Sequence, residues 1–217
     1  MALTTRSSGP RGAAAACYPA RAAARPLSSS VRPLEGVKVN RFVLTMMLVA
    51  SQPVLSGTLL AREFTLTDHG KLEIAIPESW QSDVRQPPNG LPPTLHFVPG
   101  SGQPFEILVT PLWPMNGRAL KSDAASIRTG VEQSATEAQS QAVEKHIEVK
   151  ELKSNSGTGF YFAATDRAPP PGEYKHLVQG VLPISDLLLS FTILTTDGQG
   201  AVVEQALTAL KQAVHQN

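Results

Sequence analysis

The chain has 217 residues, of which 41% are hydrophobic and 17% are charged, and its formal net charge is +1. This composition excludes a fully disordered polymer, a collagen-like repeat and a multi-span membrane protein. The charge is unevenly distributed, because residues 1–61 carry a net charge of +6 and residues 62–217 a net charge of −5. The two parts are therefore expected to differ in function, and the acidic part, residues 62–217, is not expected to bind nucleic acid.

Residues 1–36 are predicted to form a disordered extension. They are rich in Ala, Arg, Ser and Pro, and their few large apolar residues follow no helical or strand period. Two interpretations stay open for this stretch. It is either a plastid transit peptide, which would direct the protein to a thylakoid lumen, or the result of a gene start assigned too far upstream.

Residues 37–61 have the layout of a secretory signal peptide. Two basic residues precede the apolar run Phe42–Ala50, which is followed by small and turn-forming residues. We expect cleavage near Ala61, or alternatively after Ser56 or Gly57, and hence a periplasmic or secreted protein. A retained membrane anchor is the alternative, since the uncharged stretch is about long enough to span a bilayer.

Residues 62–217 are expected to form one domain, whose elements follow from the spacing of apolar side chains. Alternation predicts four strands in its first half, near 63–67, 71–77, 95–97 and 105–113. Helical spacing then predicts a helix over 121–141. Four more strands are predicted near 145–152, 158–165, 173–182 and 186–196, followed by a closing helix from about Val202, with His215 in its last turn.

The order of these elements predicts the fold class. Connections of hairpin length favour a mostly antiparallel sheet. Two strands that are apolar on both faces require cover on each side of that sheet. We therefore predict an α+β fold, an α/β/α sandwich with a mostly antiparallel sheet flanked by helices.

Two segments of the domain resemble a known family. Leu72–Trp80 is a strand ending in Ile-Pro-x-x-Trp, and Gly159–Gly180 is similar to the second-half hairpin of uncharacterised bacterial exported members. Both are features of the PsbP-like fold family, and the resemblance covers residues 62–217. It implies an antiparallel sheet between helices and an accessory or binding role, and it brings no metal-site motif onto this sequence.

The sequence contains none of the common catalytic or cofactor-binding motifs, so we assign no catalytic residue, no cofactor and no enzymatic activity. The single cysteine, Cys17, precedes the domain, which excludes disulfides and thiolate chemistry within it. Glu173 and His176 have a spacing that suits a metal on a helix. On the expected strand their side chains point to opposite faces, so no metal site is predicted.

The candidate ligand-binding residues lie at strand ends and around the proline-rich loop after residue 165: Trp80, Trp113, Asp166, Arg167, Glu173 and His176. Packing in the core is the competing interpretation for both tryptophans. We predict an exported accessory or binding protein, a monomer or homodimer, that binds an envelope protein or a small ligand. The alternatives are a hydrolase-type enzyme with a cleft near Asp166, Glu173 and His176, and a thylakoid-lumen photosystem accessory protein.

Overall fold

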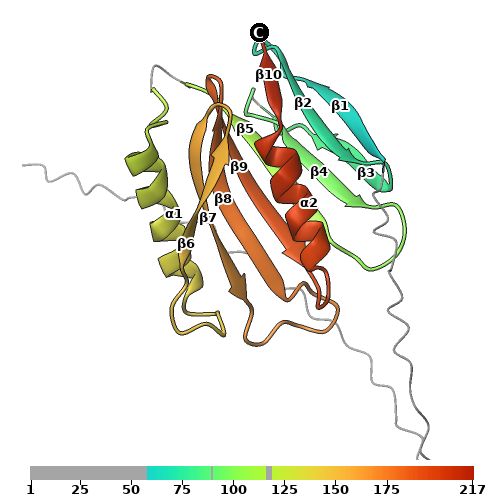
Figure 1. Cartoon of the computed structure of the whole chain (residues 1–217), viewed down its shortest axis with the longest axis vertical. Helices are drawn as coiled ribbons and strands as arrows, with labels where there is room; N and C mark the ends of the chain where they lie inside the picture. The colour runs from blue at the N-terminus through green and yellow to red at the C-terminus, as the bar shows by residue number, and fades with distance from the viewer. Residues whose placement is uncertain (1–57, 89, 116–118) are drawn as a thin grey trace, which may run out of the picture. The chain divides into compact units, whose positions relative to one another are not determined.

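The computed structural model describes residues 58–88, 90–115 and 119–217, and Figure 1 shows how their helices and strands are arranged. The predicted extension and most of the predicted signal peptide lie outside these residues. Among the described helices, none is long and apolar enough to cross a membrane.

Within the described residues, ten strands form two sheets in which every neighbouring pair is antiparallel. In spatial order, the larger sheet contains β3 (Trp80–Arg85), β4 (Thr94–Pro99), β5 (Glu106–Leu112), β9 (Leu187–Thr195), β8 (His176–Ile184), β7 (Gly157–Thr165) and β6 (Val149–Ser154). The smaller sheet contains β1 (Leu59–Thr65), β2 (Lys71–Pro77) and β10 (Val214–Gln216). The helices are α1 (Ala124–Ala138) and α2 (Gly200–Lys211).

The helices lie on opposite faces of the seven-stranded sheet. Helix α2 and the β1–β2 hairpin pack over one face and enclose the larger core, which includes Leu189 and Phe191 of the central strand β9. Helix α1 packs over the other face at β6, β7 and β8, where it encloses the smaller core around Phe162. Figure 1 shows α2 in front of the sheet and α1 at its edge. The predicted α+β fold with helices on both sides of an antiparallel sheet is confirmed.

Helix α1 is shorter than predicted at both ends. It begins after Asp123, whose side chain accepts a hydrogen bond from the Ser126 amide at 2.9 Å and so caps the helix. Its buried residues Ile127, Val131 and Ala135 are spaced by four, which places them on one face. The helix ends at Ala138, and the chain turns back toward β6.

Two short strands were not predicted. Strand β3 has only Trp80 buried, and its other side chains are polar or exposed, so it gives no apolar alternation. Strand β10 replaces the predicted last turn of the closing helix, so the prediction for His215 is wrong. The His215 ring is buried, and its Nε2 donates to the His69 carbonyl at 2.7 Å. Its Nδ1 lies 2.7 Å from Asp186 Oδ1 without hydrogen-bond geometry.

Two predicted strands begin later than expected. Strand β8 begins at His176, so Glu173 lies in the preceding turn rather than on the strand. Strand β6 begins at Val149, so the residues just before it have no strand conformation. In both places polar side chains continue the apparent alternation beyond the point where the backbone pairs with a neighbouring strand.

Candidate functional site

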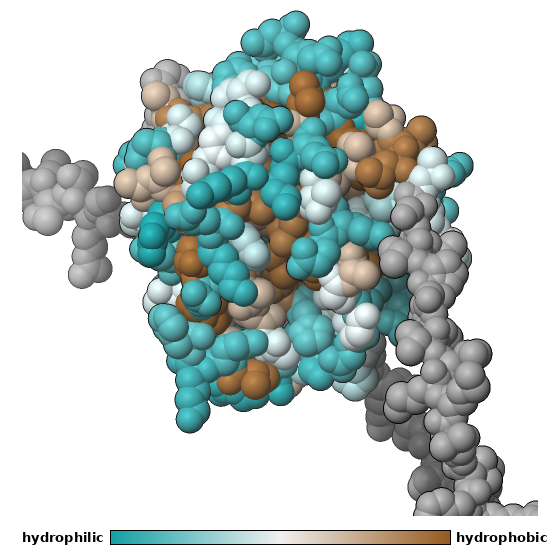
Figure 2. Space-filling model, in the orientation of Figure 1, coloured by the Kyte–Doolittle hydropathy of each residue, from teal (hydrophilic) through white to brown (hydrophobic). Residues whose placement is uncertain are grey.

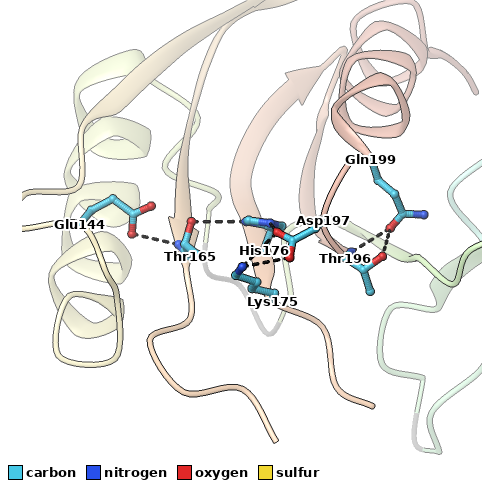
Figure 3. Close-up of polar contacts among 7 residues, drawn as sticks. All are labelled: Glu144, Thr165, Lys175, His176, Thr196, Asp197 and Gln199. Atoms are coloured by element: carbon cyan, nitrogen blue, oxygen red, sulfur yellow. Dashed lines mark hydrogen bonds and ion pairs between the residues drawn. The ribbon is translucent and has the colours of Figure 1, made fainter. Parts of the chain in front are cut away.

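A row of polar side chains crosses one end of the seven-stranded sheet, where β7 ends and β8 begins (Figure 3). Thr165 is paired with His176, and His176 is paired with Thr195 on the next strand. Directly opposite residues of antiparallel strands point to the same face. Together with Glu144, Lys175 and Asp197 these residues form what we call the sheet-end row.

His176 is the centre of this row. Its Nε2 lies 2.9 Å from Asp197 Oδ1 and its Nδ1 lies 3.3 Å from Thr165 Oγ1. Lys175 Nζ donates to both oxygens of Asp197, at 3.1 and 3.0 Å. The hydrogen bonds from His176 and then from Lys175 lower the pKa of Asp197, so this carboxylate is ionised at neutral pH.

Glu144 and Gln199 fix the two ends of the row (Figure 3). Glu144 Oε2 accepts a hydrogen bond from the Thr165 amide at 2.9 Å. Burial raises the pKa of Glu144. The hydrogen bonds from Thr165 and the electrostatic effect of the nearby His176 lower this pKa by more, so the pKa of Glu144 is lowered overall. Gln199 Oε1 accepts from the amide and hydroxyl of Thr196, at 2.8 and 2.9 Å, which holds the start of α2 against the end of β9.

A pocket of about 330 Å³ opens beside the row on the face that carries α1. Its floor is apolar, because Ala164, Leu177 and Leu194 are directly opposite one another on β7, β8 and β9. Polar side chains stand at its rim. We call it the α1-side pocket; it is lined by Ala138, Gln141, Ala142, Ala164, Thr165, Asp166, Tyr174, Lys175, His176, Leu177 and Leu194.

A second cavity, of about 350 Å³, opens on the opposite face between α2 and strands β7 and β8. Figure 2 shows hydrophobic surface along the sheet beside α2, bordered by hydrophilic side chains. We call this cavity the α2-side groove. It is lined by Glu144, Ala163, Ala164, Thr165, His176, Leu177, Val178, Thr195, Thr196, Gly198, Gln199, Gly200, Val203 and Glu204.

The predicted loop residues lie close to the α1-side pocket. Asp166 and His176 both line it. Asp166 Oδ1 accepts a hydrogen bond from the Ala168 amide at 2.9 Å, which closes a turn in the loop. Arg167 Nη2 donates to the Ala142 carbonyl at 2.7 Å and so ties this loop to the segment after α1. Glu173 is exposed in the turn before β8.

Both predicted tryptophans lie in the core, away from the sheet-end row. Trp80 is 5% exposed, and its ring centre is 5.0 Å from that of Phe105. Trp113 is 9% exposed and stacks on His69 at 4.2 Å. The two rings therefore contribute packing at opposite ends of the first half of the domain.

Sequence reasoning missed most of the residues that surround His176. Asp197 and Thr165 are far from His176 along the chain and have no motif in common with it. The signal that could have found Thr195 and Asp197 is the β8–β9 hairpin, in which two strands of nine residues flank a tight turn. Pairing from that turn places His176 opposite Thr195.

A second polar cluster lies on the part of the sheet that α1 does not cover. His96 is 8% exposed, and its ring has Nδ1 2.6 Å from Asp83 Oδ1 and Nε2 2.9 Å from Glu106 Oε1. Arg85 Nη2 also lies within 3.0 Å of the ring nitrogens. These contacts join β3, β4 and β5. Within the described residues no group of His, Cys, Asp or Glu side chains is arranged to hold a metal ion.

Comparison with known proteins finds one similarity at the level of structure. The fold is similar to the solution structure of cyanobacterial PsbP (CyanoP) from Synechocystis sp. PCC 6803, with a TM-score of 0.47 and 11% sequence identity. The match covers 77% of this chain and 99% of that chain. No family model and no curated protein matches the sequence. The similar structure is a PsbP, and the PsbP-like fold family is the one that the sequence resembles.

Proposed function

We propose that this protein is an exported, non-catalytic binding protein whose ligand occupies the α1-side pocket. The observation that supports this most is the alignment of Ala164, Leu177 and Leu194 into a continuous apolar floor, with polar groups only at the rim. Small-molecule sites in proteins have this character, and they occupy roughly 300–1,000 Å³. The pocket lies at the lower end of that range, which favours a small ligand.

The rim indicates what kind of ligand fits. Tyr174 and Lys175 offer hydrogen-bond donors beside the apolar floor. Burial raises the pKa of Tyr174, and the charge of Glu106 adds to this effect, so its phenol keeps its proton at neutral pH. We therefore propose a small apolar molecule with one polar end that accepts hydrogen bonds from the rim.

Filling the pocket tests this proposal. Ala138 is partly buried at the end of α1, where it packs against the edge of the smaller core and lines the pocket, so Ala138→Leu extends a larger side chain into the pocket. Ala125→Leu is the matched control, because Ala125 is exposed near the start of the same helix. Anilinonaphthalene sulfonate, an apolar dye with one anionic end, serves as the probe.

We expect Ala138→Leu to weaken dye binding by about fivefold or more, since a side chain then occupies space that the ligand needs. Ala125→Leu should bind the dye as the unaltered protein does. Equal dye affinity in Ala138→Leu and the unaltered protein would exclude the α1-side pocket as the site.

A hydrolase is the second candidate. A hydroxyl, an imidazole and a carboxylate are joined by hydrogen bonds, in the order Thr165, His176 and Asp197. One feature argues against it, because Asp197 is shared with Lys175. The rate of hydrolysis of a chromogenic ester tests this candidate. A rate that falls in Thr165→Val and Asp197→Asn but is retained in Thr165→Ser would favour the enzyme.

The proposed export also has a consequence for processing. Strand β1 begins at Leu59, and its first three residues pair with β2 from Pro77 to Ala75. Cleavage after Ala61 would remove these three pairs. We therefore propose that the signal peptide is removed after Ser56 or Gly57, and that the processed protein is periplasmic or secreted.

A further inference from the structure

Strand β1 lies at the outer edge of the small sheet (Figure 1), and within the described residues no strand pairs with its other side. In an antiparallel pair, every second residue directs its amide and carbonyl to the neighbouring strand. The Glu78 amide donates to the Thr58 carbonyl at 2.9 Å, and the Leu66 amide donates to the Gly70 carbonyl at 2.8 Å. The even-numbered residues of β1 therefore face β2. The residues whose backbone groups face the open edge are Leu59, Ala61, Glu63 and Thr65.

This open edge is accessible, and it is apolar where the strand begins. Its four residues are all exposed, and the first two residues of β1, Leu59 and Leu60, are 54% and 43% exposed. Strand β1 has seven residues that pair with β2 without a bulge and include no proline, whereas β10 at the other edge of this sheet has three. A long edge strand without such protection is a template for pairing with another chain.

Arg62, at the centre of β1, is a cation without a charged partner. It lies on the same face of the strand as Phe64, which is 7% exposed and packs edge-to-face on Phe97. Its Nε is buried and has no hydrogen-bond partner among the described residues. Among the same residues, no carboxylate oxygen lies within 4.0 Å of its nitrogens. Since buried polar groups nearly always have a partner, this guanidinium is available to a carboxylate from outside the chain.

A strand added to β1 would bring a side chain to Arg62. Directly opposite residues of antiparallel strands share a face, and their Cβ atoms are about 4.5–5.5 Å apart. An acidic residue at the position opposite Arg62 would therefore form a cross-strand ion pair with it. Apolar residues two positions away on the added strand would lie opposite Leu60 and Phe64 on the same face.

A second copy of this chain does not supply that carboxylate. Two antiparallel copies of β1 would pair even-numbered residues with even-numbered ones, because their outward backbone groups alternate in step. Glu63 of one copy thus never lies opposite Arg62 of the other, and it is already paired with Lys71 at 2.8 Å. Registers centred on Arg62 or Glu63 would place like charges opposite each other, which is unfavourable. The register centred on Ala61 would place Arg62 opposite Leu60.

We propose that the open edge of β1 binds an extended segment of another protein, which adds an antiparallel strand and places an acidic residue opposite Arg62. In this mode of recognition, backbone hydrogen bonds supply affinity and alternate side chains supply specificity. The site goes beyond the proposed function, because no residue of β1 lines the α1-side pocket.

A synthetic peptide tests the site by nuclear magnetic resonance titration of the labelled protein, isolated from cells that express the full-length gene. The probe is Thr-Val-Lys-Glu-Thr-Val-Thr with both ends capped, whose Glu lies opposite Arg62 when the peptide pairs with residues 59–65. We expect a Kd of about 1 mM, since a short peptide loses much conformational freedom on binding, and amide shifts centred on β1. The same peptide with Gln in place of Glu should bind about fivefold more weakly. Proline in place of the Thr after Glu removes an amide that faces β1 and should prevent binding.

Variants of the protein separate the two parts of the proposal. Arg62→Met keeps an unbranched stem without the charge, so it should weaken binding of the Glu peptide about fivefold and leave binding of the Gln peptide unchanged. Ala61→Pro removes an amide that faces the open edge and not β2, so it should prevent binding of both peptides while β1 stays paired. Ala61→Ser keeps that amide and is the matched control. Thermal unfolding followed by circular dichroism checks that each variant is folded.

Three results of the titrations would overturn the proposal: equal affinity for the Glu and Gln peptides, full peptide binding by folded Ala61→Pro, or no amide shifts at about 10 mM peptide, well above the expected Kd. Sedimentation of the protein as a dimer that Ala61→Pro makes monomeric would also overturn it, because a second copy would then occupy the edge. Ala138→Leu should leave peptide binding intact, so failure of this proposal is distinguishable from failure of the α1-side pocket.

Discussion

Replacing Gly180 by alanine tests the strand register on which the floor of the α1-side pocket depends. Gly180 lies in β8, directly opposite Tyr161 on β7 and Phe191 on β9. A Cβ atom there would lie 2.4 Å from the Phe160 carbonyl oxygen and 2.6 Å from both Phe191 Cζ and Tyr161 Cβ. Ordinary contacts between carbon atoms are about 3.5–4.0 Å. Since one of the three neighbours is backbone, β7 and β8 must move apart.

The size of the effect follows from these contacts. Overpacking in a well-packed core costs about 1–3 kcal/mol. The lower entropy of the unfolded alanine chain offsets about 0.4–1 kcal/mol of this cost. The net loss is then about 1.3 kcal/mol. At roughly 2–4 °C per kcal/mol for a domain of this size, it lowers Tm by about 3–5 °C in a thermal unfolding experiment followed by circular dichroism.

Gly130→Ala is the matched control, because the same substitution should have the opposite effect there. Gly130 lies in α1, and a Cβ atom added to it meets no atom within 4 Å. Alanine is favoured over glycine in a helix by about 0.8–1.0 kcal/mol, so Tm should rise by about 2–4 °C. If Gly180→Ala matched or exceeded the unaltered protein in Tm, the described β7–β8–β9 packing would be refuted.

The remaining predictions concern the sheet-end row, the carboxyl-terminal strand and processing. Because the pKa of Asp197 is lowered in the folded state, its contribution to stability is present above about pH 4 and is lost as the pH falls through that lowered pKa. The Tm difference between Asp197→Asn and the unaltered protein should therefore shrink on acidification; a constant difference would contradict this. His215→Ala leaves the His69 carbonyl without its donor and should cost about 1–3 kcal/mol in chemical denaturation; an unchanged midpoint would argue against a structural role for β10. Amino-terminal sequencing of the processed protein should find a start at Gly57 or Thr58, and a start at Arg62 would show that β1 tolerates the loss of its first three pairs.

The fold was predictable where apolar side chains repeat with a clear period. Strand β2 alternates buried and less buried residues along its length, and β9 is buried on both faces at its start, as expected for a covered central strand. Strands β3 and β10 carry no such signal. One is mostly polar and the other has three residues, so tertiary pairing rather than local pattern determines them.

The candidate site was predictable only in part. His176 and Asp166 belong to the α1-side pocket because they adjoin a loop that returns to the sheet end. The partners Thr165 and Asp197 are brought to His176 by the register of two hairpins, and no spacing along the chain indicates that register. Trp80 and Trp113 show the opposite problem, since a large aromatic residue at a strand end has the same sequence signal whether it faces a cleft or the core.

The most direct test of the central claim is to locate the bound dye by nuclear magnetic resonance. Anilinonaphthalene sulfonate is titrated into the isotopically labelled protein, and the shifts of backbone amides are followed. We predict the largest shifts at Ala164, Leu177 and Leu194, which form the floor of the α1-side pocket, and the loss of these shifts in Ala138→Leu. Shifts that instead centre on the β1–β2 hairpin, or that persist in Ala138→Leu, would contradict the assignment of this pocket as the ligand site.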